Sequence, residues 1–208
     1  MDGLMFNTEE LYEYVGGEIL RRRGHTLTTD LLNEMMGRPS PISLQIMIDR
    51  HGLTDNVSDL ERENDQLFDE ILPTRLQTMP GLLELLDWLE MRGIAKAITT
   101  SSRRAMFDRL MVLSGLLPRF EFSITAEDIT HGKPHPQIYD MAADRFGVPT
   151  SRMMVLEDSQ IGCRAAVAAN SFAVAVPGDH SRHHEFVGVR FIADTLHDTR
   201  IYAAIESA

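Results

Sequence analysis

The sequence contains one cysteine and one tryptophan, and it has no long hydrophobic run. Cys163 has no second cysteine with which to form an intrachain disulfide, so we expect a reducing, cytoplasmic compartment and a thiol that fills the core. No stretch approaches the roughly 20 apolar residues that a membrane-spanning helix needs, and the N-terminus lacks the basic-then-apolar pattern of a signal peptide. The sequence therefore predicts a protein that does not act at membranes.

Basic residues are also few, with 20 Lys and Arg against 31 Asp and Glu and a formal charge of −11. Because nucleic acids are bound through clustered Lys and Arg, this balance argues against a nucleic-acid partner. With 43% hydrophobic and 25% charged residues, 208 residues can bury one good core and a small attached domain. We expect a compact monomer or weak homodimer.

Two patterns divide the chain. Residues 9–77 repeat apolar positions at helical spacing, which predicts an inserted unit of four or five helices. After Pro80-Gly81, amphipathic helices alternate with short apolar runs, which indicates βαβ crossovers and a parallel sheet. The strands are expected at 94–99, 122–125, 153–156, 172–176 and 191–192. The predicted fold is α/β, with a Rossmann-like core from residues 1–8 and 78–208.

Polar residues follow three of these expected strands, where ligands bind in an open parallel sheet. Thr100-Ser101-Ser102 ends a strand and opens a helix, an arrangement that binds phosphate through hydroxyl and N–H groups. A plain helix N-cap is the alternative for Ser102. Lys133 is held between Gly132 and Pro134, and the alternative for it is a solvated loop lysine.

Glu157-Asp158 directly follows the apolar run 153–156. Acidic pairs are common in surface turns, but carboxylates placed at a buried strand end are costly without a cation. Mg²⁺ prefers such hard oxygen ligands and keeps several waters. This pair therefore predicts a magnesium site.

Together with Asp2-Gly3 and the downstream Asn7-Thr8-Glu9, these segments resemble, in order and spacing, the haloacid dehalogenase-like hydrolase superfamily. The likeness is to its β-phosphoglucomutase-like and phosphatase branch, and it covers nearly the whole chain. The resemblance implies phosphoryl transfer through an aspartyl-phosphate, with Mg²⁺ as the cofactor and a small phosphorylated metabolite as the partner. Taken alone, Asp2 would be a frayed terminal residue.

The resemblance also implies roles for individual residues. Thr100 and Lys133 are the expected catalytic groups beside Asp2, which would act as acid and base and contact the metal. Asp158 is the expected direct metal ligand, and Glu157 is expected to act through water. The expected substrate-binding residues are Gly3, Ser101, Ser102 and Arg38.

The family's opening motif is Asp-x-Asp-Gly at the end of a central strand, and its first Asp is the nucleophile. Here Met1 occupies the position x, so that Asp and its strand are not in the sequence. Their loss would leave the neighbouring strands about 9.6 Å apart, twice the usual spacing of about 4.8 Å. We expect the natural product to start upstream and the chain as printed to be inactive.

Residues 9–77 have the size and place of the family's helical cap. Gly37-Arg38-Pro39 resembles a cap loop that presents Arg to an anion, and a solvent-facing Arg is the alternative. Related sugar phosphomutases carry a His on the first cap helix and a Lys on the last, where this chain has Tyr12 and the acidic run 61–63. A phosphatase is therefore favoured over a mutase, and a catalytically silent protein that binds a phosphorylated ligand or Mg²⁺ is the main alternative.

Overall fold

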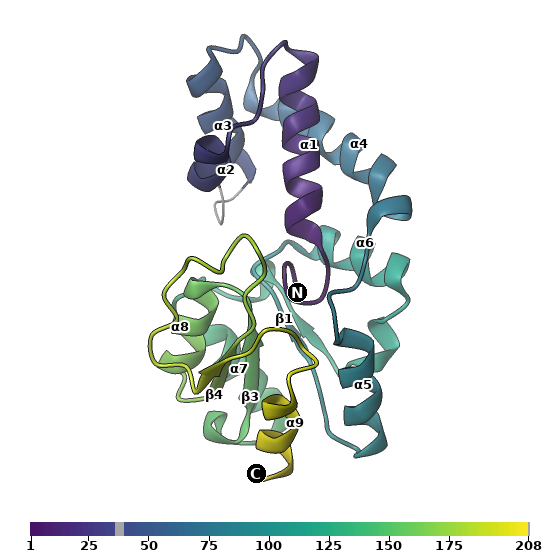
Figure 1. Cartoon of the computed structure of the whole chain (residues 1–208), viewed down its shortest axis with the longest axis vertical. Helices are drawn as coiled ribbons and strands as arrows, with labels where there is room; N and C mark the ends of the chain where they lie inside the picture. Colours follow the sequence, from purple (N-terminus) through teal and green to yellow (C-terminus); the bar gives the residue numbers. More distant parts are fainter. Residues whose placement is uncertain (36–39, 208) are drawn as a thin grey trace. The chain divides into compact units, whose positions relative to one another are not determined.

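The computed structural model of this chain describes residues 1–35 and 40–207. The chain divides into two compact units (Figure 1). Residues Met1–Asn7 with Gln77–Ala208 form the core unit, and Thr8–Leu76 form the helical unit. Among the described residues, no helix combines the length and apolar character needed to cross a membrane.

The helical unit contains four helices in its described part: α1 (Thr8–Arg22), α2 (Thr29–Met35), α3 (Ser40–His51) and α4 (Val57–Arg75). Helix α4 packs against both α1 and α3. The face of α1 that the helical spacing predicted is buried, with Leu11, Val15, Ile19 and Leu20 no more than 2% exposed. At the end of α1, Arg23 forms ion pairs with Asp55 and Glu63 and so ties this end to the start of α4.

The core unit confirms the expected α/β fold with parallel strand pairing. Strand β1 (Ile98–Thr99) pairs with β2 (Ser123–Ile124), and β3 (Met154–Glu157) pairs with β4 (Phe172–Ala175), which pairs with β5 (Phe191–Ile192). The connecting helices are α5 (Leu82–Met91), α6 (Arg104–Ser114), α7 (Gln137–Phe146), α8 (Gln160–Ala168) and the C-terminal α9 (Thr199–Glu206). Short 3₁₀ turns lie at Leu117–Arg119, Ala126–Asp128 and Thr150–Arg152.

Two strands are shorter than the sequence predicted. The expected strand 94–99 is regular only at Ile98–Thr99, and 122–125 only at Ser123–Ile124. The described strands form two separate sheets, β1–β2 and β3–β4–β5, with no ladder between β1 and β3. Strand β1 therefore has a hydrogen-bonded neighbour on one side only, and this limits how far its extended backbone can be paired.

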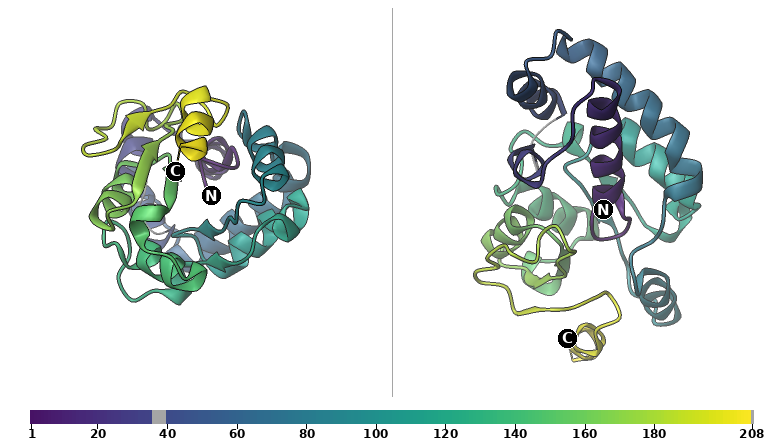
Figure 2. Two further views of the ribbon diagram at one scale, coloured as in Figure 1. Left: turned by 90° about the horizontal axis from the view of Figure 1, so that it is seen from below. Right: turned by 45° about the horizontal axis from the view of Figure 1, so that its top comes forward.

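The N-terminal segment lies between the two strand groups as a tight turn (Figure 2, left). The Met5 amide donates to the Met1 carbonyl at 2.8 Å, and the Met79 amide donates to the Met5 carbonyl at 2.8 Å. Gly3 has φ of 64°, a conformation that glycine adopts readily. Phe6 is fully buried. The turn is thus anchored to the core unit and places Asp2 close to the end of β1.

One apolar cluster joins the two sheets. Ile124 of β2 and Val155 of β3 belong to the same buried cluster, together with Tyr139 of α7 and Ala165 of α8. The small side chains of α8 allow its backbone to approach the sheet closely. Cys163 of α8 is buried, as expected, and burial raises the pKa of its thiol to about 12.

Gly81, which precedes α5, has φ of 85°, and a Cβ built on it would lie 2.4 Å from the His197 backbone nitrogen. We expect Gly81→Ala to lower the free energy of unfolding by about 3 kcal/mol, since left-handed strain and overpacking each cost about 1–2 kcal/mol. Urea unfolding followed by circular dichroism measures this loss. Gly93→Ala is the matched control, because its φ of 62° is similar but no described atom lies within 4 Å of the added Cβ. Equal losses in the two variants would contradict the close backbone contact.

Candidate active site

Asp2, Thr100 and Ser102, three of the expected site residues, meet at the end of β1. The Ser102 hydroxyl donates to Asp2 Oδ2 at 2.6 Å, and the Thr100 hydroxyl donates to the same oxygen at 3.3 Å. The Ser102 amide donates to Thr100 Oγ1 at 3.0 Å, which fixes the turn that leads toward α6. Ser101 lies in this turn with an exposed side chain. The hydroxyl-bearing turn and the carboxylate of the opening motif thus form one cluster.

The second oxygen of the Asp2 carboxylate is buried without a hydrogen-bond partner among the described residues. Buried polar atoms are almost always paired, because an unpaired one loses its hydration without compensation. A cation or a substrate hydroxyl placed at Asp2 Oδ1 would supply that pairing. This oxygen therefore marks a position where a ligand could bind beside the Thr100 and Ser102 hydroxyls.

A second cluster surrounds Glu157, the last residue of β3. Its carboxylate pairs with the Lys133 ammonium, and the two side chains are only 9% and 7% exposed. The Tyr139 hydroxyl donates to Glu157 Oε1 at 2.6 Å, and the Ser159 hydroxyl donates to Oε2 at 3.1 Å. The loop lysine is therefore buried and paired, which excludes the solvated alternative considered for it.

Charges around Glu157 decide its ionisation. Burial acts to raise the pKa of this carboxyl, but the positive charges of Lys133 and of the Met1 amino group outweigh it and lower the pKa. The pKa of Tyr139 is raised well above its usual value, first by burial and then by the neighbouring Glu157 charge. Glu157 is therefore a carboxylate and Tyr139 a neutral phenol that donates to it.

Gly162 permits this arrangement. A Cβ built on Gly162 of α8 would lie 2.0 Å from Glu157 Oε2, so the carboxylate occupies space that any side chain would fill. Asp158 follows Glu157 directly and is half-buried. Arg38 lies outside the described residues.

Asp2 can supply an oxygen ligand for a hard cation such as Mg²⁺, whereas Glu157 has little capacity left for one. The orphaned Asp2 oxygen fits a cation, and Mg²⁺ is usually held by one or two carboxylates together with waters and substrate phosphate. Within the described ranges, no three His, Cys, Asp or Glu side chains gather into a metal-binding group. Glu157 already accepts from three donors, so its oxygens are largely committed. The assignment of Asp2, Glu157 and Asp158 to a metal stays a prediction.

Tyr139 was not expected in the site. It belongs to one of the amphipathic helices expected after Pro80-Gly81, where an aromatic residue is ordinary core. A signal was present, because a buried tyrosine normally needs a hydrogen-bond partner for its hydroxyl. The identity of that partner could not be read from the sequence, since Glu157 lies 18 residues away.

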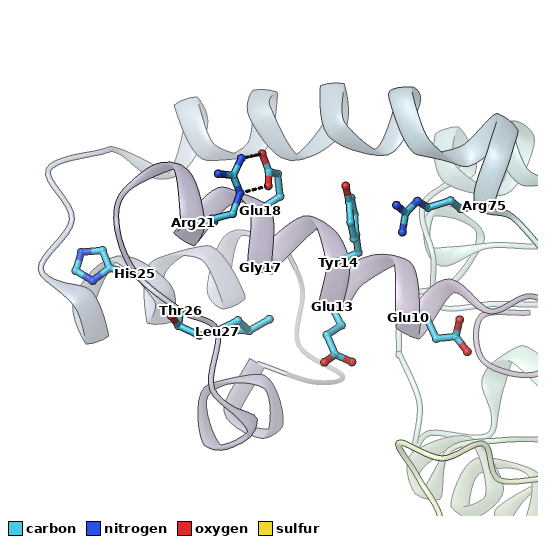
Figure 3. Close-up of a pocket in the computed structure, with 10 residues that line it drawn as sticks. All are labelled: Glu10, Glu13, Tyr14, Gly17, Glu18, Arg21, His25, Thr26, Leu27 and Arg75. Atoms are coloured by element: carbon cyan, nitrogen blue, oxygen red, sulfur yellow. Dashed lines mark hydrogen bonds and ion pairs between the residues drawn. The ribbon is translucent and has the colours of Figure 1, made fainter.

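The helical unit has a pocket of its own, of about 580 Å³ (Figure 3). The Arg75 guanidinium lies 4.0 Å from the centre of the Tyr14 ring at one part of its wall. At another part, Arg21 pairs with Glu18 at 2.7 Å, and hydrogen bonds from Arg21 and Arg22 lower the pKa of Glu18 to about 2. Glu10, Glu13, Gly17, His25, Thr26 and Leu27 also line it. The pocket is thus lined by both acidic and basic side chains. The sequence did not predict this pocket.

Hydroxyl groups and carboxylates lie at the ends of the parallel strands. This arrangement is that of a hydrolase of the haloacid dehalogenase-like class. The chain belongs to this family, because the family model described as haloacid dehalogenase-like hydrolase matches residues 1–176. The resemblance seen in the motifs and the expected enzyme class are both confirmed.

Relatives and solved structures extend this result. The chain is 28% identical over 170 residues to the phosphorylated carbohydrates phosphatase of Thermotoga maritima, covering 81% of this chain and 78% of that protein. It is 31% identical over 183 residues to the probable pseudouridine-5'-phosphatase of Drosophila melanogaster, covering 85% and 79%. The crystal structure of CbbY from Rhodobacter sphaeroides in complex with phosphate aligns with a TM-score of 0.79 and 25% identity, covering 94% and 92%.

Proposed function

We propose that this protein is a Mg²⁺-dependent phosphatase that hydrolyses small phosphorylated metabolites. The observation that carries the proposal is the pair of clusters at the strand ends, with Asp2, Thr100 and Ser102 in one and Lys133 and Glu157 in the other. Similarity to proteins named as phosphatases supports it. The proposed reaction is the hydrolysis of a phosphoric monoester.

In the proposed reaction, each side chain of the site has a separate role. The Thr100 and Ser102 hydroxyls and the backbone amides of their turn bind phosphate oxygens. A lysine ammonium has three N–H donors, so Lys133 can bond Glu157 and still direct positive charge at the transferring phosphoryl group. Asp2 protonates the leaving oxygen and then activates water. Gly3 and Ser101 line the substrate, and Arg38 is proposed to contact it from the helical unit.

The attacking carboxylate is the residue that the sequence does not contain. In the proposed pathway it belongs to a segment that precedes Met1, and it forms an aspartyl-phosphate that water then hydrolyses. The absence of a ladder between β1 and β3 in the described sheet supports this placement, since a strand paired with both would carry that residue.

Asp2 and Asp158 are proposed to hold the metal, with Glu157 acting through water or by fixing Lys133. When bound, Mg²⁺ supplies positive charge against the developing negative charge of the phosphoryl group. The orphaned Asp2 oxygen supports this assignment.

The helical unit is proposed to serve as a cap that selects the substrate. Sugar phosphates are the first class to test, because one relative is a phosphorylated carbohydrates phosphatase and a variant of CbbY was solved in complex with xylulose-(1,5)bisphosphate. A silent protein that binds a phosphorylated ligand is the second candidate, favoured by the hydroxyl groups of Thr100 and Ser102 that gather beside Asp2 at the end of β1. A cytoplasmic location accords with the single buried thiol.

The two proposed functions can be distinguished by comparing two forms of the protein. The printed chain and a form extended upstream to supply the strand and its Asp are assayed for Mg²⁺-dependent hydrolysis of p-nitrophenyl phosphate and a sugar phosphate panel. We expect hydrolysis by the extended form only, with loss of activity in EDTA. If both forms bind phosphate and neither hydrolyses an ester, the phosphatase proposal is wrong and the protein is a phosphate-ligand binding protein.

A further inference from the structure

The Tyr139 side chain is part of the buried cluster around Glu157 and Lys133. Tyr139 is 1% exposed, and its hydroxyl donates to Glu157 Oε1 at 2.6 Å, the same oxygen that pairs with Lys133. The Lys133 ammonium also lies 5.3 Å from the centre of the Tyr139 ring. One residue thus contacts both members of the ion pair, through its hydroxyl and through its ring.

The position of Tyr139 in the fold gives this contact a further role. Helix α7 packs against β1, and Tyr139 belongs to the apolar cluster that includes residues of β2 and β3. Through its helix and this cluster, Tyr139 thus connects the region of β1 to the end of β3, between which the described strands form no ladder.

We propose that Tyr139 is a positioning residue, whose hydroxyl fixes the Glu157 carboxylate and thereby directs Lys133 toward the phosphoryl group. A carboxylate oxygen that accepts from two donors has a defined orientation. Without the phenol, that oxygen is held by the flexible lysine alone, and both side chains gain freedom. The consequence for catalysis rests on the proposed function, whereas the consequence for Lys133 does not.

The sequence offers an unusually direct probe of Lys133, because the chain contains only two lysines, Lys96 and Lys133. Protein with ¹³Cε-labelled lysine gives one NMR signal from each, and Lys133→Arg assigns them. Lys96 pairs with Glu90 at 3.0 Å on α5, away from the Glu157 cluster, and serves as an internal reference. The signals report on lysine environment whether or not the protein hydrolyses a phosphate ester.

Tyr139→Phe removes the hydroxyl and keeps the ring. The matched control is Tyr202→Phe, since the Tyr202 hydroxyl is buried without a hydrogen-bond partner in the described part of the chain. We expect Tyr139→Phe to shift the Lys133 signal and leave the Lys96 signal in place, and Tyr202→Phe to move neither. An unchanged Lys133 signal, or equal shifts of both lysines in folded protein, would overturn the positioning role.

Kinetics of the upstream-extended form supply the second readout. A hydrogen bond to a charged group is worth tenfold or more in an equilibrium or rate, so we expect Tyr139→Phe to lower kcat about tenfold with KM changed less than about threefold. Tyr202→Phe should keep the parent values. A melting temperature lowered with kcat intact would mean that the hydroxyl is only structural. Failure of the parent to hydrolyse any ester would refute the phosphatase alone, and the NMR result would still decide the positioning role.

Discussion

Lys133→Met is expected to lower the free energy of unfolding by about 4 kcal/mol. The substitution keeps the length of the side chain but leaves the Glu157 carboxylate buried without its cation. Breaking a buried ion pair by removing one partner costs about 3–5 kcal/mol, because an uncompensated charge stays in the low-dielectric interior. Urea unfolding at pH 7 measures the loss, and the extended form should also lose its hydrolytic activity.

The double variant Lys133→Met/Glu157→Gln is the control for this prediction. With both charges removed, most of the lost stability should return, since the amide oxygen can still accept from Tyr139 while the amide nitrogen donates to the Ser159 hydroxyl oxygen. If the double variant were as unstable as Lys133→Met, the loss would come from packing around the lysine stem and the charge explanation would be wrong.

The pH dependence of the same variants has a defined sign. In the parent the pKa of Glu157 is lowered on folding, so its contribution to stability is complete above its unfolded pKa and is lost as the pH falls through the lower folded value. In Lys133→Met, burial remains and its main opposing charge is gone, which raises the pKa of Glu157 on folding. The stability gap between variant and parent should therefore narrow as the pH is lowered from 7 toward 4.

Gly162→Ala is expected to disturb the Glu157 cluster directly. In a helix interior alanine is normally better than glycine by about 1 kcal/mol, but here the new methyl group would overlap the Glu157 carboxyl group. We expect a net loss of about 3 kcal/mol, because the carboxylate must leave its place among Lys133, Tyr139 and Ser159. Chemical denaturation measures stability, and activity of the extended form should fall with it.

Gly17→Ala is the matched control, because Gly17 lies within α1 and no described atom is within 4 Å of its added Cβ. This variant should be more stable than the parent by up to about 1 kcal/mol. The two substitutions are chemically identical, so the opposite signs isolate the contact with Glu157. A gain of stability in Gly162→Ala would show that the carboxylate does not occupy this space.

Much of the site could be predicted from the chain because its residues are placed by local structure. Thr100 follows β1 and Glu157 ends β3, and each of these strands lies between an apolar run and a helix that the sequence shows. Parallel strands present their carboxyl ends on one side. For the same reason the motifs sufficed to name the family. Arg38, the expected contact from the helical unit, lies outside the described residues and stays a prediction.

Short-range periodicity and motif spacing encode the alternation of helices and strands, the class of hydrolase and the residues at the strand ends, so all three could be predicted from the chain. The two-residue length of β1, the division of the sheet, and the way Tyr139 and Gly162 shape the space around Glu157 became visible only in the folded structure. Each of these depends on which atoms fill the space beside a group. Such neighbours come from distant parts of the chain, and no local pattern specifies them.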